Sequence, residues 1–234
     1  MTRMRASKAL LREALGASDW RVRLEQTISE VPGAFVGPLM SFLLQGGTLA
    51  GRAAVLLGAC VAALARERPE EARVVMRRFM WHMNEESGNL GWGIPESMAE
   101  ALARSAALAK EFSRVLISYI WNTGREDNFV EYAPLRRCCY WAVGRLLQAR
   151  PELAASALPH LRAGLRDEDI SCRGMAAWAL AQIDVLEELR PELEALALAA
   201  ESATTPVSVF DGDVARECTV AGLAWLALSK EGRL

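Results

Sequence analysis

Arg136-Arg-Cys-Cys-Tyr-Trp-Ala-Val-Gly144 has two counterparts further along the chain, and this repetition decides the fold. The counterparts begin at Arg173 and Arg216, at spacings of 37 and 43 residues. In each copy, small residues stand six and eight positions after the arginine, and an aliphatic residue stands seven positions after it. Repeats of this length are typical of stacked helix pairs, in which small side chains let neighbouring helices approach closely. The sequence therefore predicts an elongated array of small units.

The rest of the chain supports an all-α fold. Apolar residues make up 52% of the 234 residues, they recur with the helical period of 3.6, and no stretch of strand length alternates strictly. Weaker copies of the repeat are found at 96–103, 52–58 and 18–24. We therefore predict a right-handed α–α superhelix of about six helix pairs, with residues 1–234 forming a single repeat domain.

This repeat resembles a known family. A second helix that opens with an acidic residue, a short gap and an arginine, followed by small and aliphatic residues, is similar to the HEAT-like repeats of the phycobilisome-lyase type. The insertion at 84–95 resembles that of a bacterial subgroup of HEAT-repeat proteins, and this resemblance implies no activity. The third unit departs from the pattern because Glu96 stands where arginine is usual, after a long insertion at 84–95.

Charge and composition argue against several classes of function. The 27 basic residues nearly balance the 29 acidic ones, so nucleic acid is an unlikely partner. The longest apolar run, 53–65, is too short to span a bilayer and predicts a buried helix. The N-terminus lacks the pattern of a signal peptide, and the five cysteines show no CxxC spacing. We therefore expect a cytoplasmic protein that does not associate with a membrane and binds no metal or cofactor.

The recurrent arginines have two interpretations. Arg136, Arg173 and Arg216 could line a groove as anion-binding groups, or each could pair with an acid near its own helix start, such as Asp169 or Asp213. The second interpretation is favoured, because a residue repeated in every unit is more often there for stacking. Tryptophans 141, 178 and 225 are predicted to fill the gaps between layers.

Irregular segments between the helices form the candidate binding surface. The segments 84–93, 122–131, 167–169 and 201–211 are predicted to join first to second helices and to stack along one edge that is rich in acids and amides. These side chains could equally be helix caps and turn residues. The candidate partner-binding residues are Glu85, Glu86, Asn89, Trp92, Glu96, Asp127, Asn128, Tyr132 and Arg136.

A binding protein is the leading functional prediction. No catalytic set can be nominated by spacing, and the two histidines, His82 and His160, lie far apart. We therefore predict a non-enzymatic scaffold that presents an acidic loop edge and a concave surface to another protein, and the acidic edge favours a basic partner. The alternative is an enzyme on a HEAT-like scaffold, of the tetrapyrrole-lyase or DNA-alkylation-repair-glycosylase type, which the resemblance suggests by analogy.

Overall fold

The structure, a computed structural model, describes residues 2–84, 91–125, 127–184 and 187–229. Within these ranges the chain forms thirteen α-helices and one pair of strands. The helices are α1 (Thr2–Gly16), α2 (Trp20–Glu30), α3 (Pro32–Met40), α4 (Gly47–Glu67), α5 (Pro69–Met83), α6 (Ile94–Arg104), α7 (Ala106–Ser118), α8 (Ala133–Ala149), α9 (Ala154–Gly164), α10 (Ile170–Leu180), α11 (Arg190–Leu198), α12 (Ala200–Thr204) and α13 (Val220–Leu228). The strands are β1 (Pro206–Phe210) and β2 (Ala215–Thr219).

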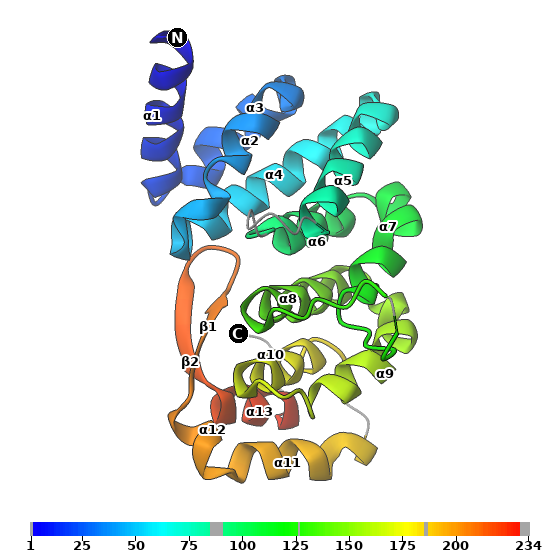
Figure 1. The fold of residues 1–234 in the computed structure, drawn as a ribbon. Helices are drawn as coiled ribbons and strands as arrows, with labels where there is room; N and C mark the ends of the chain where they lie inside the picture. The colour runs from blue at the N-terminus through cyan, green and yellow to red at the C-terminus, as the bar shows by residue number, and fades with distance from the viewer. Residues whose placement is uncertain (1, 85–90, 126, 185–186, 230–234) are drawn as a thin grey trace.

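Successive helices stack in two layers (Figure 1). The helices α4, α6, α8, α10 and α13 pack against each other in that order and form one layer. The helices α5, α7 and α9 lie along one side of this layer, while α3 packs on α4 and α11 packs on α13 at its two ends. One hydrophobic core runs through the described units from Leu11 to Ala227. The predicted all-α stack of helix pairs is therefore confirmed.

Small residues set the distance between neighbouring core helices, as the repeat predicts. Gly144 on α8 lies so close to α10 that a Cβ atom there would stand 2.9 Å from the Cα of Ala179. Gly58 on α4 meets α6 in the same way, because a Cβ atom there would stand 2.8 Å from the backbone nitrogen of Ala101. A larger side chain at either position would push two units of the array apart.

The chain also contains a β-hairpin, which corrects three predictions. Strands β1 and β2 pair antiparallel, with Val207 opposite Cys218. Val207 and Val209 are buried and Ser208 between them is exposed, a short alternation typical of a strand. The prediction that no strand is present was therefore wrong, and 201–211 is not a simple loop. Arg216 lies in β2 instead of opening a helix, so α13 begins at Val220.

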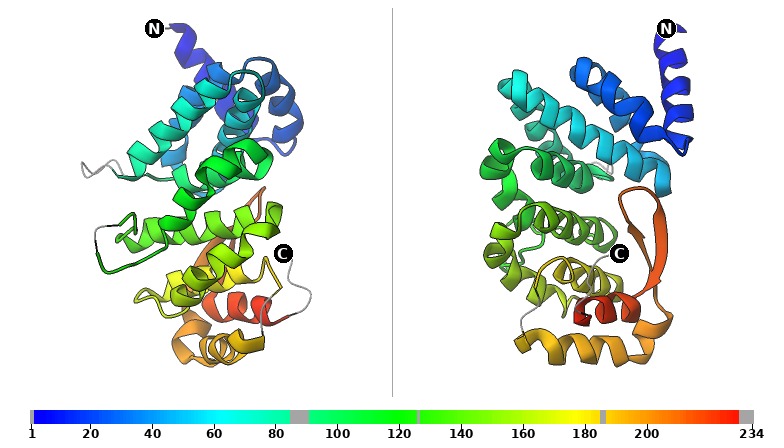
Figure 2. Two further views of the ribbon diagram at one scale, coloured as in Figure 1. Left: turned by 90° about the vertical axis from the view of Figure 1, so that its right-hand side faces the viewer. Right: turned by 180° about the vertical axis from the view of Figure 1, so that it is seen from behind.

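The hairpin runs back along one edge of the array to its N-terminal units (Figure 2). The Trp141 indole Nε1 on α8 donates a hydrogen bond to the backbone oxygen of Phe210, at 2.9 Å. On the other strand, the backbone nitrogen of Ala215 donates to Thr48 Oγ1 on α4, at 3.2 Å. The hairpin therefore bridges units that are distant in the sequence.

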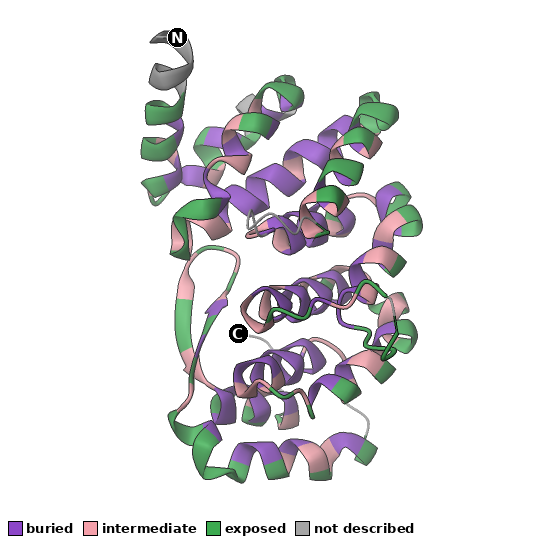
Figure 3. Ribbon diagram, in the orientation of Figure 1, coloured by how far each residue is buried: buried purple, intermediate pink, exposed green. Residues whose placement is uncertain are grey.

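The predictions for the long apolar helix and for the three tryptophans between layers are only partly confirmed. Helix α4 is long and apolar enough to cross a membrane, but 67% of that apolar window is buried inside the protein, as in a core helix (Figure 3). Trp141 and Trp178 are buried and stack with 5.8 Å between ring centroids, as predicted. Trp225 is 49% exposed, so its predicted place between layers was wrong.

Candidate functional site

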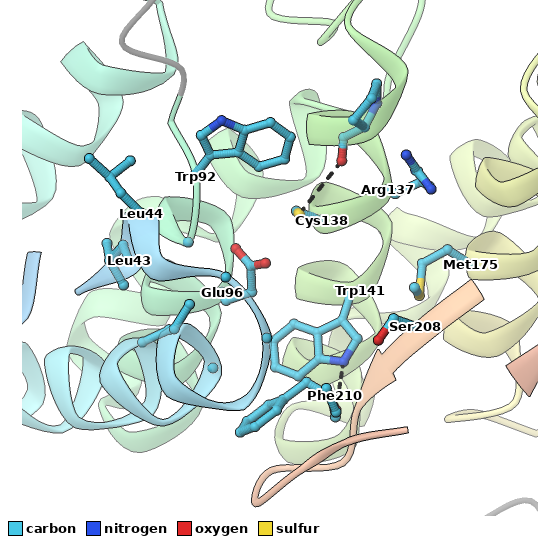
Figure 4. A pocket seen from close by; sticks show the side chains of 18 of the residues that line it. Leu43, Leu44, Trp92, Glu96, Arg137, Cys138, Trp141, Met175, Ser208 and Phe210 are labelled. Atoms are coloured by element: carbon cyan, nitrogen blue, oxygen red, sulfur yellow. Dashed lines mark hydrogen bonds between the residues drawn. The ribbon is translucent and has the colours of Figure 1, made fainter. Parts of the chain in front are cut away.

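A pocket of about 500 Å³ lies where the N-terminal parts of α4, α6 and α8 meet the β-hairpin (Figure 4). Its volume is in the range of small-ligand sites, and its wall is mostly apolar. Met175 of α10 and the η1 turn (Leu43–Gln45) complete the wall. The pocket therefore draws on residues from most of the chain, which the stacked array and the returning hairpin bring together.

Two helices line the pocket through residues that recur with helical spacing. Helix α8 contributes Pro134, Arg137, Cys138 and Trp141, at relative positions zero, three, four and seven. Helix α4 contributes the small residues Gly47, Ala50, Gly51 and Ala54 with the same spacing. This spacing places each set on one face of its helix. The small side chains of α4 leave the space that the larger side chains of α8 border.

Glu96 is the acidic group of the pocket. It stands in the first turn of α6, and its carboxylate points into the space between Trp92, Cys138 and Trp141 (Figure 4). Its Oε2 atom is buried and has no hydrogen-bond partner among the described residues. Burial raises the pKa of Glu96 above its ordinary value, and hydrogen bonds from its own backbone N–H and from the Cys138 thiol only partly offset this effect. Among the residues that the structure describes, the Glu96 carboxylate therefore has no ion-pair partner.

Arg137 and Cys138 are the other polar groups on α8. The Nε of Arg137 is buried and, within the described part of the chain, has no hydrogen-bond partner. No ion pair between Arg137 and Glu96 is found among the residues that the structure describes. Burial, together with the charge of Glu96, raises the pKa of the Cys138 thiol well above its ordinary value. This thiol therefore stays protonated and is a poor nucleophile.

Aromatic side chains line both ends of the pocket. Trp92 is half-buried and makes an edge-to-face contact with Tyr132, with 6.0 Å between ring centroids. Tyr132 itself is 48% exposed and does not line the pocket. Phe210 and Trp141 lie together at the other end, with 6.3 Å between their ring centroids. Of the predicted binding residues, the structure thus brings Trp92 and Glu96 into the pocket and Tyr132 beside it.

Arg136 makes contacts that hold neighbouring units of the fold together. Its guanidinium donates to the backbone oxygens of Val130 and Glu131 and forms a two-pronged pair with Asp167, at 2.7 and 2.8 Å. The residue is only 6% exposed. Four of its five N–H donors join the start of α8 to the next unit, so the prediction of Arg136 as an exposed anchor does not fit its position. The interpretation of the recurrent arginine as a stacking residue is confirmed here, although its acid comes from the following unit.

The other predicted residues lie outside the pocket. Asp127 organises its own turn by accepting hydrogen bonds from Thr123 and from the backbone nitrogen of Phe129. Asn128 donates to Ser118 Oγ at 3.0 Å. Both contacts are those of turn residues on an exposed loop. Glu85, Glu86 and Asn89 lie outside the described residues.

Sequence reasoning missed several pocket residues. Arg137 and Cys138 follow the repeat arginine directly, and the arginine repeat drew attention to Arg136 instead. Their spacing with Pro134 and Trp141 was the available signal, because it marks one helix face. Ser208 and Phe210 had no usable signal, since their place depends on how the hairpin folds back across the array.

Comparison with known proteins supports the repeat type. Residues 133–183 match the model of the HEAT-like repeat, and this segment spans α8, α9, α10 and most of the turn after α10. The match covers less than a quarter of the chain, and it contains the Arg136 and Arg173 copies of the repeat. The comparison with curated proteins found no match.

Proposed function

We propose that this protein is a non-enzymatic binding protein whose pocket receives a basic side chain of a partner protein. One observation carries the proposal: the buried Oε2 of Glu96 has no partner among the described residues, in a pocket that is otherwise mostly apolar. HEAT-like repeats are commonly scaffolds for protein interactions, and the match at 133–183 supports this broad class.

Charge compensation favours a cationic guest. A carboxylate that is removed from water costs free energy unless an opposite charge or hydrogen bonds replace the water. The head of a lysine or arginine side chain would supply both to Glu96. The rings of Trp92 and Trp141 border the same space and attract a cation through their faces. The aliphatic stem of the guest would pack against Ala50 and Gly51 on α4.

The mouth of the pocket suits a protein partner. Tyr132 is exposed beside Trp92, and large aromatic residues are common anchors in protein interfaces. The loop that carries Asp127 precedes Tyr132 in the sequence, and its charge would steer a basic partner toward the pocket. We propose this acidic loop edge as the outer part of the same binding surface, on a scaffold that works in the cytoplasm.

Synthetic peptides test the proposal directly. The probes are acetylated, amidated pentapeptides with randomised apolar residues on both sides of a central arginine, lysine, glutamine or norleucine. Fluorescence anisotropy of labelled peptide pools measures their affinity for the full chain. We expect arginine or lysine at the centre to bind about tenfold or more tighter than glutamine or norleucine, because a hydrogen bond to a charged group contributes about 1.5–3 kcal/mol and about 1.4 kcal/mol is a tenfold change.

Glu96→Gln is the decisive variant, because it keeps the shape of the side chain and removes its charge. We expect this variant to lose the preference for a basic centre. Glu168→Gln, on the exposed turn before α10, is the matched control and retains it. A preference that survives in Glu96→Gln, or equal affinity of wild type for all four centres, would contradict the proposed function.

A further inference from the structure

Strand β1 has one edge that β2 does not use. In the antiparallel pair, Asp211 N donates to Val214 O and Val220 N donates to Thr205 O. In an antiparallel ladder, every second pair of opposite residues is hydrogen-bonded. The backbone N–H and C=O groups of Val207 and Val209 therefore also point toward β2. The backbone N–H and C=O of Ser208 therefore point to the opposite edge.

Two independent contacts agree with this alternation. Phe210, two residues after Ser208, accepts the Trp141 indole through its backbone oxygen on the edge away from β2. Ala215, which pairs with Phe210, donates its N–H to Thr48 and also points away from the ladder. Ser208 thus shares an edge with the Phe210 oxygen that bonds α8, and it lines the pocket and is exposed.

We propose that the partner contributes an extended segment that pairs with the free edge of β1 at Ser208 and directs one basic side chain to Glu96. This inference rests on the proposed function and names the backbone conformation of the ligand. An extended segment can exchange backbone hydrogen bonds with an exposed strand edge, whereas the backbone of a helix is already satisfied internally. Glu96 supplies the charge complementarity that selects the basic residue.

Arg137 fits the same ligand. Its buried Nε has no partner among the described residues, and it lines the pocket together with Met175 and Ser208 (Figure 4). The backbone carbonyl of an extended segment is an acceptor suited to this N–H. A free amine or a small aromatic cation would satisfy Glu96 and leave both Arg137 Nε and the edge of Ser208 unused. These two groups therefore favour a peptide over a small cation.

A scan of N-methylated peptides tests the pairing without changing the protein. The probe is the tightest arginine- or lysine-centred pentapeptide, N-methylated at one position at a time. Alternate N–H groups of a strand point to opposite sides, so we expect methylation at every second residue to weaken binding about tenfold or more. Methylation at the intervening residues should change the affinity less than about twofold. An effect that does not alternate would overturn strand pairing.

A pair of substitutions at Ser208 provides the matching test on the protein side. Ser208→Pro and Ser208→Ala both remove the hydroxyl, but only proline removes the backbone N–H. Because β2 does not use that N–H, proline is compatible with this edge of the hairpin. We expect Ser208→Pro to lose about tenfold in affinity for the unmethylated probe, and Ser208→Ala to retain it. Equal affinity of the two variants would contradict the role of the edge.

The two proposals fail in different ways. If the basic side chain enters the pocket but the segment does not pair with β1, the preference for arginine or lysine depends on Glu96 while the methylation pattern does not alternate. If neither holds, wild type shows no preference for a basic centre. Near-ultraviolet circular dichroism of the tryptophans, including Trp141 at the hairpin, checks that Ser208→Pro keeps the fold.

Discussion

Arg52 on α4 binds Asp213 at the tip of the hairpin, and so joins residues 161 positions apart. Its Nε donates to the backbone oxygen of Asp213 at 2.9 Å, and its Nη2 lies 3.2 Å from the Asp213 carboxylate. The same guanidinium donates to the backbone oxygens of Leu15 and Ala17 at the end of α1. One side chain therefore holds the first helix and the hairpin against the core of the array.

Removing the Arg52 side chain is expected to destabilise the protein strongly. Arg52 is only 7% exposed, so Arg52→Ala would leave buried backbone oxygens without donors. We expect a loss of about 2–4 kcal/mol in the free energy of unfolding, measured by urea denaturation.

Asp213 separates the roles of charge and hydrogen bonding in the same cluster. Its Oδ1 accepts from the buried Trp20 indole at 2.6 Å, and an asparagine oxygen can accept the same bond. We expect Asp213→Asn to cost less than about 1 kcal/mol because the Asp213 side chain is half exposed, and Asp213→Ala to cost about 1–3 kcal/mol. Equal losses for these two variants in urea denaturation would show that charge, and not the bond to Trp20, is what matters.

Gly51 tests how closely the hairpin packs on α4. A Cβ atom at this position would stand 2.5 Å from ring carbons of Phe210, so Gly51→Ala must displace the ring or the hairpin. We expect it to cost about 1–3 kcal/mol in urea denaturation. Gly16→Ala, at the end of α1 with open space around it, is the control and should be within about 0.5 kcal/mol of wild type or more stable. A neutral Gly51→Ala would mean that Phe210 repacks freely.

The helical array could be predicted because its cause is local and repeated. Gly144 recurs in equivalent places of the copies as Ala181 and Ala224, and the close approach of Gly144 to α10 gives that pattern its physical reason. The hairpin could not, because a five-residue strand such as β1 is specified mainly by what it packs against. Val207 and Val209 are buried by helices of the array, and their local sequence carries only a short alternation.

The candidate site was only partly predictable for the same reason. Trp92 was found from its place in a long insertion within a regular repeat and Glu96 from its place where arginine is usual, and both line the pocket. Arg136 was chosen because it recurs, but recurrence marks what every unit needs for stacking. The residue beside it, Arg137, does not recur, and its buried Nε has no partner among the described residues.

This difference between neighbours predicts a large loss of stability when Arg136 is replaced and a small one when Arg137 is replaced. Arg136→Ala would break the buried pair with Asp167 and expose unsatisfied oxygens of Val130 and Glu131, at a cost of about 3–5 kcal/mol. Arg137→Ala removes no hydrogen bond of Nε within the described chain and should cost less than about 1 kcal/mol. Thermal and urea unfolding of the two variants measure the difference. Similar losses would show that Arg137 also supports the fold.

Glu96 should make the protein, measured without a partner peptide, less stable as the pH rises. Burial raises its pKa in the folded state above the ordinary value of 4.5, so the folded protein retains a proton that the unfolded chain has already released. Stability therefore falls as the pH rises from 4.5 through the raised pKa, and stays lower above it. We expect Glu96→Gln to be more stable than wild type at pH 7 and to approach it below about pH 4 in urea denaturation, with Glu168→Gln as the control. A pH-independent difference would instead mean that Glu96 is solvated or paired in the folded state, and would remove the physical basis for its selection of a basic guest.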